Sequence, residues 1–222
     1  MEDSPIKFPQ RKIKKNYRSI TGHFPSIKNN TSIGFESKLE KAHFLALEFD
    51  NEVISYQEQP QIEIFFNGKN QIYSADCYIK RVKNSSKKDS IVEVKYTNEI
   101  EKKKEYFERR FESAKISANK LNLDFEVYTE QNHSEIYLDN LDFLYRYKLY
   151  PIENKYENQI IGLLKENKKI SAFELANLIS QNLKDYPTIS NCIWDLVCKK
   201  KLRSDLESAK VTMNSFVELA SE

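Results

Sequence analysis

The segment Ile91-Val92-Glu93-Val94-Lys95 constrains the fold of this 222-residue chain more than any other stretch. It belongs to an extended pattern at residues 90–96 in which β-branched side chains occupy both faces. A strand that is apolar on both faces belongs inside a sheet, where neighbouring elements cover it on each side. We therefore expect residues 90–96 to form a central strand.

The patterns on either side of this strand predict an α/β domain with a mixed sheet flanked by helices. A broad apolar face at residues 35–49 predicts a helix, and a turn is expected at Asn67-Gly68. The other expected elements are strands at 53–56, 61–66, 71–82 and 125–129, and helices at 98–121 and 134–147. Three antiparallel-leaning strands followed by alternating helices and strands are typical of this class.

Beyond Pro151 the pattern changes to short helices. We expect one helix at about 156–166, a second short helix that begins at a capping box formed by Ser171 and Glu174, and a third at about 187–201. A terminal hairpin is expected at 202–211. Three short helices and a β-wing resemble a winged helix. The predicted domains are therefore a basic N-terminal arm (1–30), a catalytic α/β domain (31–150) and a small winged-helix-like C-terminal domain (151–222).

The composition excludes several classes of protein. The chain has no run of about 18 apolar residues, so no membrane span is expected, and its first residues lack the apolar region of a signal peptide. The three cysteines, Cys77, Cys192 and Cys198, show no C-x-x-C spacing. This pattern argues against a disulfide framework or a zinc site and favours reduced thiols in the cytoplasm.

Positive charge is concentrated near the N-terminus. Residues 1–30 contain seven basic and two acidic residues, a net charge of +5 in a chain whose total is +2. Such an arm could bind phosphates, or it could be a solvated terminus without a specific role. A second basic group, Lys199-Lys200-Lys201 with Arg203, is compatible with a DNA-binding or a protein-docking winged helix.

The candidate chemistry lies on the central strand. Glu93 and Lys95 are two residues apart and share one face, while Val92 and Val94 face the other way. Asp76 lies 17 residues earlier, near the end of the neighbouring predicted strand, where a hairpin would bring its carboxylate next to Glu93. Converging carboxylates with an adjacent ammonium group are suited to metal-dependent phosphodiester hydrolysis.

The residues alone leave other interpretations open. The Glu93–Lys95 pair could be a salt bridge on a solvated sheet face. Glu36 and Glu40 lie on one face of the first helix, so either could point toward the sheet or into solvent. His43 could join a site, although a lone helical histidine is more often a packing residue.

Several segments, in this order and spacing, resemble the TnsA endonuclease subunit of heteromeric bacterial transposases. The resemblance runs from about Phe24 nearly to the end of the chain. The matching stretches are Phe24-Pro25-Ser26-Ile27-Lys28, Phe35-Glu36-Ser37-Lys38-Leu39-Glu40, Phe44-Leu45-Ala46-Leu47-Glu48-Phe49, Gln57-Glu58-Gln59-Pro60, Tyr73-Ser74-Ala75-Asp76, Ile91-Val92-Glu93-Val94-Lys95, Phe125-Glu126-Val127-Tyr128-Thr129-Glu130, and Ile193-Trp194-Asp195-Leu196 with Leu202, Asp205 and Leu206.

The resemblance implies a restriction-endonuclease-like catalytic domain that cuts double-stranded DNA at the 5′ ends of a mobile element. It also implies two partners, a TnsB-like DDE transposase and a TnsC-like ATPase. Carried over by position, the catalytic set would be Glu40, Asp76, Glu93 and Lys95. The chain departs from the family at Ala75, where proline is common, which affects backbone rigidity more than ligation.

This set predicts Mg²⁺ as the cofactor, with Mn²⁺ as a substitute. The expected metal ligands are Glu40, Asp76, Glu93 and the carbonyl of Val94, with Asp76 bridging two ions. Lys95 would orient or deprotonate the attacking water and offset charge on the phosphate. Two alternatives stay open at this point: a stand-alone nuclease of the same fold, such as a restriction enzyme or junction resolvase, and a non-catalytic DNA- or protein-binding adaptor.

Overall fold

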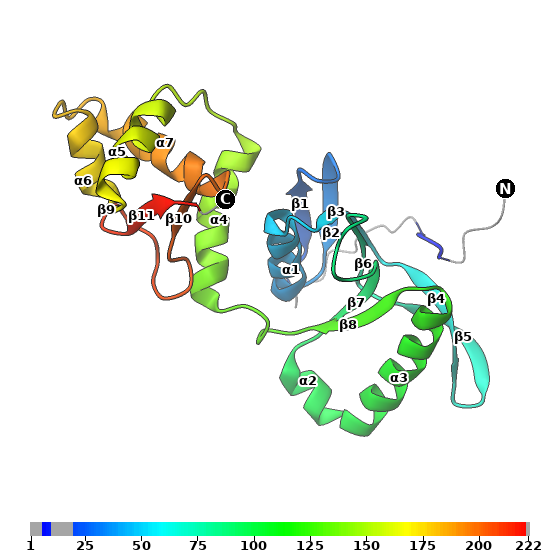
Figure 1. Cartoon of the computed structure of the whole chain (residues 1–222). Coiled ribbons are helices and arrows are strands. Elements are labelled where there is room, and N and C mark those ends of the chain that lie inside the picture. Colours follow the sequence, from blue (N-terminus) through cyan, green and yellow to red (C-terminus); the bar gives the residue numbers. More distant parts are fainter. Residues whose placement is uncertain (1–5, 10–19, 221–222) are drawn as a thin grey trace. The chain divides into compact units, whose positions relative to one another are not determined.

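A computed structural model describes residues 6–9 and 20–220 of the chain. The chain divides into two compact units, Met1–His133 and Ser134–Glu222 (Figure 1). The division precedes the helix at 135–149, which falls within the predicted catalytic domain (31–150). The predicted boundary near residue 150 therefore lies one helix later than the division between the units.

The first unit is built around a four-stranded mixed sheet. Its strands run in the order β3-β6-β7-β8; the β3–β6 and β6–β7 pairs are antiparallel, and β7–β8 is parallel. All five residues of β7 are buried, as expected for a central strand. The strands are β3 (Val53–Glu58), β6 (Cys77–Arg81), β7 (Ser90–Val94) and β8 (Asp124–Tyr128). With its flanking helices, this is the arrangement of a restriction-endonuclease-like α/β fold.

Helices contact the sheet through apolar side chains. Helix α1 (Lys38–Phe49) contacts β3 and β7, and α3 (Lys104–Lys120) packs on β8 and on strand β4. Ala114 and Ala118 of α3 share an apolar cluster with Ile91 of β7. The long helix predicted at 98–121 is wrong in one respect: Lys103, with φ −136° and ψ 41°, separates α2 (Thr97–Lys102) from α3.

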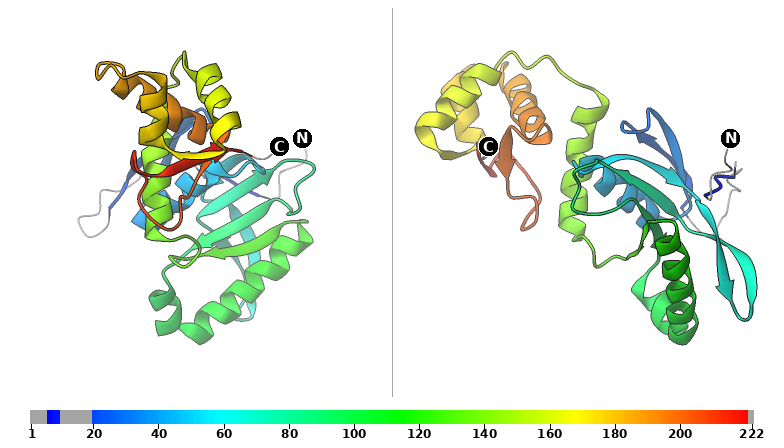
Figure 2. Two further views of the ribbon diagram at one scale, coloured as in Figure 1. Left: turned by 60° about the vertical axis from the view of Figure 1, so that its left-hand side comes forward. Right: turned by 45° about the vertical axis from the view of Figure 1, so that its right-hand side comes forward.

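The strand predicted at 71–82 is divided between two sheets. Its first half, β5 (Lys69–Ser74), pairs with β4 (Gln61–Phe66) in a separate ribbon beside α3, and its second half is β6 (Figure 2). At the crossing, the Asp76 N–H donates to the Val92 carbonyl and the Asp76 carbonyl accepts from Gln59. The predicted turn at Asn67-Gly68 is confirmed, with φ of 53° and 78°.

Part of the predicted basic arm belongs to the folded unit. Strands β1 (Gly22–Ser26) and β2 (Thr31–Phe35) form a hairpin that contacts α1. The Lys7 backbone exchanges hydrogen bonds with Gln61. Residues 1–5 and 10–19 of the predicted arm, which include its basic residues Arg11, Lys12, Lys14, Lys15 and Arg18, lie outside the described residues.

A buried carboxylate joins this hairpin to the rest of the unit. Glu48, at the end of α1, is 1% exposed and accepts hydrogen bonds from Ser26 Oγ at 2.6 Å and Tyr56 Oη at 2.9 Å. The Lys28 ammonium donates to the carbonyls of Asp50 and Val53. The 24–28 motif therefore has a structural role, because its polar side chains tie three elements together.

Over its described residues, 134–220, the second unit combines four helices with a three-stranded antiparallel sheet in the order β10-β11-β9. Its elements are α4 (Glu135–Leu149), α5 (Glu157–Asn167), β9 (Lys169–Ser171), α6 (Ala172–Ile179), α7 (Tyr186–Cys198), β10 (Leu202–Ser204) and β11 (Phe216–Leu219). The predicted capping box at Ser171 and Glu174 is confirmed at the start of α6. The winged-helix assignment stays a prediction.

The terminal hairpin predicted at 202–211 is wrong in its second strand, which lies at 216–219. The side-chain amide of Asn140 donates to the carbonyls of Leu206 and Ala209, and its oxygen accepts from the Val211 N–H. Backbone groups of the segment 206–211 that would pair with a second strand are therefore hydrogen-bonded to the Asn140 side chain on α4 instead. In the part of the chain that the structure describes, no helix is both long and apolar enough to cross a bilayer.

Candidate active site

Three of the four predicted catalytic residues meet at the C-terminal end of β7. Glu93 is on β7, Lys95 follows it, and Asp76 occupies the crossing between β5 and β6. The β6–β7 register pairs Cys77 with Val92, so Asp76 comes next to Glu93. The hairpin geometry expected from the sequence is therefore present.

Backbone hydrogen bonds hold Asp76 in place. The Val94 N–H donates to Asp76 Oδ2 at 2.7 Å, and the Asp76 N–H donates to the Val92 carbonyl at 3.0 Å. The Asp76–Val92 bond extends the contact between the two backbones past the last residue of the ladder, and the bond from Val94 ends on the side-chain carboxylate. The Asp76 carboxylate is thereby fixed against β7 rather than left to solvent.

Glu93 is held through both of its carboxylate oxygens. The Lys95 ammonium lies 3.2 Å from Oε1, and the Tyr73 hydroxyl donates to Oε2 at 2.5 Å. Glu93 is 9% exposed, so the pair with Lys95 is not a salt bridge on a solvated sheet face. Tyr73 was not among the predicted site residues, because its position opposite Glu93 depends on β5 leaving the main sheet.

Glu40 lies on α1 and acts on this site through its charge. Its oxygens accept from the Glu36 N–H and the Ser37 hydroxyl, both at 2.9 Å, while Ser37 caps the helix. Its charge acts on Asp76, so the structure brings Glu40 within electrostatic reach of the β7 residues. Glu36 contributes a backbone donor to this arrangement.

The electrostatics of the site show an excess of negative charge. Burial, the Glu93 carboxylate and the Glu40 carboxylate raise the pKa of Asp76 to about 7, against the opposing effects of the Val94 N–H and Lys95. Burial by itself lowers the pKa of Lys95, but Glu93 and Asp76 outweigh it and the net pKa is raised. Lys95 is therefore a cation at neutral pH beside carboxylates that repel one another.

The chemistry of this donor set fits a hard divalent cation. All the candidate side-chain ligands are carboxylate oxygens, the type that Mg²⁺ prefers. Among residues 6–9 and 20–220, no three His, Cys, Asp or Glu side chains form a ready ligand cluster. Each of the three carboxylates instead accepts a hydrogen bond from a neighbouring protein group, and the charges of Glu93 and Glu40 both act on Asp76.

Comparison with known families assigns this part of the chain. Residues 50–130 match the family described as TnsA-like endonuclease N terminal. They form a TnsA-like endonuclease domain. The match runs from just before β3 through β8 and contains Asp76, Glu93 and Lys95, whereas Glu40 precedes it. The predicted resemblance is confirmed for this stretch, and no curated protein matches the chain significantly.

His43 packs beside the TnsA-like domain's last strand. It is 5% exposed, and its ring centroid lies 4.5 Å from that of Tyr128. Burial lowers its pKa to about 3, with smaller contributions from His133 and Arg81. Since the imidazole is neutral and its ring packs at an angle of 46° to that of Tyr128, His43 behaves as a packing residue, the role expected of a lone helical histidine, rather than as a ligand.

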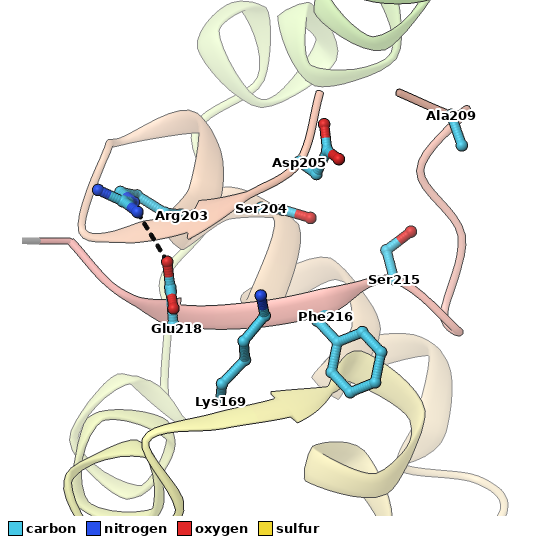
Figure 3. A pocket seen from close by; sticks show the side chains of 8 residues that line it. All are labelled: Lys169, Arg203, Ser204, Asp205, Ala209, Ser215, Phe216 and Glu218. Carbon is cyan, nitrogen blue, oxygen red and sulfur yellow. Dashed lines mark hydrogen bonds and ion pairs between the residues drawn. The ribbon is translucent and has the colours of Figure 1, made fainter. Parts of the chain in front are cut away.

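The C-terminal basic group is paired with carboxylates. Lys199 lies 2.8 Å from Asp195, Lys201 contacts Glu157, and Arg203 lies 2.8 Å from Glu218. A pocket of about 410 Å³ next to Arg203 carries both signs of charge and the exposed ring of Phe216 (Figure 3). This local balance weakens the expectation that these cations form a phosphate-binding patch.

The raised pKa of Asp76 predicts a pH-dependent cost in stability. An acid whose folded pKa lies above its unfolded value destabilises the folded state as pH rises from about 4 through 7. Asp76→Asn is uncharged at every pH and keeps an oxygen for the Val94 N–H. We expect the free energy of unfolding of this variant, in chelator, to exceed that of the wild type by about 4 kcal/mol at pH 8 and to match it near pH 4. Urea denaturation at both pH values checks this, and a constant difference between the proteins would contradict it.

Proposed function

We propose that this chain is a divalent-metal-dependent DNA endonuclease that cuts the 5′ ends of a mobile element during cut-and-paste transposition. It would act with a TnsB-like DDE transposase and a TnsC-like ATPase. The observation that carries the proposal is the meeting of Asp76, Glu93 and Lys95 at the end of β7, within the stretch that matches a TnsA-like endonuclease domain.

Asp76, Glu93, Glu40 and the Val94 carbonyl are the groups that would hold Mg²⁺, with Mn²⁺ as a substitute. A bound divalent ion would supply Lewis-acid stabilisation of charge on the phosphate. The chain itself orients these ligands. The Val94 N–H positions Asp76, Tyr73 and Lys95 position Glu93, and Ser37 positions Glu40.

Lys95 has a separate role in this proposal. The Lys95 side chain is 24% exposed, so it can meet a phosphate at the surface while its ammonium still contacts Glu93. Its raised pKa keeps it protonated, which supports a role in offsetting negative charge during strand cleavage. A protonated Lys95 does not act as the base that deprotonates water.

Removal of divalent metal tests the proposal. Purified protein, incubated with the partner proteins and DNA that carries both element ends, should cut the 5′ ends in Mg²⁺ or Mn²⁺. Excess chelator should abolish cutting, and added Mg²⁺ should restore it. Gel analysis with labelled 5′ strands measures each cut.

Two outcomes would replace this proposal with an alternative. Equal cutting without any partner protein would indicate a stand-alone nuclease of the same fold. If the wild type neither cuts nor binds Mn²⁺ in calorimetry while it still binds DNA or a partner protein, the chain is a non-catalytic adaptor.

A further inference from the structure

A buried hydrogen bond connects the candidate active site to the neighbouring β-ribbon. Tyr73 lies on β5 of the β4–β5 ribbon and is 1% exposed, whereas Glu93 lies on β7 of the main sheet. The 2.5 Å bond from Tyr73 Oη to Glu93 Oε2 therefore crosses between two sheets. With Lys95 at Oε1, it fixes both oxygens of one carboxylate.

The Tyr73 ring itself is held by its surroundings. The Arg110 guanidinium lies 5.0 Å from the ring centroid, and the Phe125 ring packs against Tyr73 at 6.1 Å between centroids. Arg110 is in turn anchored by a 2.7 Å hydrogen bond to the Tyr106 hydroxyl. Burial, followed by the charge of Glu93, raises the pKa of the Tyr73 hydroxyl, so this group remains a hydrogen-bond donor. These contacts with protein groups fix the position of the Tyr73 ring.

A donor of this kind is compatible with ligation by the same carboxylate. Each carboxylate oxygen carries two lone pairs, so an oxygen that accepts from Tyr73 or Lys95 still has one for a metal ion. Groups that orient a ligand commonly change metal affinity or activity 10- to 100-fold when they are lost.

We propose that Tyr73 is a positioning residue of the endonuclease site: its hydroxyl holds Glu93 in the orientation in which it binds a divalent cation. This inference rests on the proposed function. It assigns to the β4–β5 ribbon, which carries none of the predicted ligands, a part in assembling the metal site.

The chain contains a matched control for this hydrogen bond. Tyr56 is also 1% exposed, and its hydroxyl donates to the buried Glu48 carboxylate at 2.9 Å. Glu48 lies eight residues after Glu40 on α1, or about 12 Å along the helix axis. Tyr73→Phe and Tyr56→Phe each remove one hydroxyl from a buried tyrosine–glutamate pair, so they differ mainly in which carboxylate loses its donor.

The test compares Mn²⁺ binding and DNA cleavage in the full-length wild type and the two variants. Calorimetry should show Mn²⁺ affinity about 10- to 100-fold lower in Tyr73→Phe, with a cleavage rate reduced to a similar extent. In Tyr56→Phe the affinity should stay within about twofold of the wild type. Thermal denaturation with and without Mn²⁺ adds a readout independent of activity, because the ion should stabilise Tyr73→Phe less than Tyr56→Phe.

Two results would overturn the inference while leaving the proposed function intact. Wild-type Mn²⁺ affinity in Tyr73→Phe would exclude a positioning role, and an equal loss in both variants would indicate general destabilisation. In a Glu93→Ala background, Tyr73→Phe should cause no further loss of Mn²⁺ affinity, because the hydroxyl acts through that carboxylate. If the wild type itself neither binds Mn²⁺ nor cuts, the proposed function fails, and the inference fails with it.

Discussion

Asp76→Asn is expected to lower the rate of 5′-end cleavage about a thousandfold or more while the protein stays folded. Asp76 is the residue on which the charges of Glu93, Glu40 and Lys95 all act. Asparagine keeps the volume and an acceptor for the Val94 N–H, but it removes the charge that would attract a cation. Single-turnover cleavage of labelled element-end DNA in saturating Mg²⁺ measures the effect.

Asp89→Asn is the control for this prediction. Asp89 is also half-buried, accepts from the Arg81 N–H at 2.8 Å, and precedes β7 at the end opposite Glu93. The Asp89→Asn substitution should leave the cleavage rate within a few-fold of the wild-type rate. If Asp76→Asn cuts as fast as the wild type, Asp76 is not a catalytic residue and the proposed catalytic centre is wrong.

Glu48→Ala is expected to destabilise the first unit by about 3 kcal/mol, or about 10 °C in its midpoint of thermal unfolding. The substitution leaves the buried hydroxyls of Ser26 and Tyr56 without their acceptor and opens a cavity under the β1–β2 hairpin. Urea denaturation followed by circular dichroism gives the loss in free energy of unfolding.

The single tryptophan of the chain provides an internal control for this measurement. Trp194 is 2% exposed and lies on α7 of the second unit, so its fluorescence reports that unit. If the two units unfold independently, the transition seen by tryptophan fluorescence stays at the wild-type denaturant concentration while the dichroism transition shifts. A dichroism transition that does not move would contradict the structural role assigned to Glu48.

Local sequence patterns determined most of the secondary structure. The β-branched run at 91–94 predicted a buried central strand, Asn67-Gly68 predicted a turn, and Ser171 with Glu174 predicted a helix start; all three are present. These features depend on residues within about four positions of one another, so neighbouring side chains alone decide them.

Other elements depended on contacts between distant residues. The strand predicted at 71–82 crosses from one sheet to another, although its residues favour extended backbone throughout. The segment 206–211 forms no strand because Asn140 binds its backbone groups from a helix about seventy residues away. No local pattern contains information about which distant partner satisfies a hydrogen bond.

The same distinction applies to the candidate site. The two-residue spacing of Glu93 and Lys95 predicted that they share one face of the strand, and the hairpin predicted Asp76 beside them. Glu40 was chosen over Glu36 only through the family resemblance. Tertiary structure alone placed the Tyr73 hydroxyl on Glu93 and Glu40 near Asp76. The physical reason is that strand periodicity sets which way a side chain points, while packing of separate elements decides what it meets.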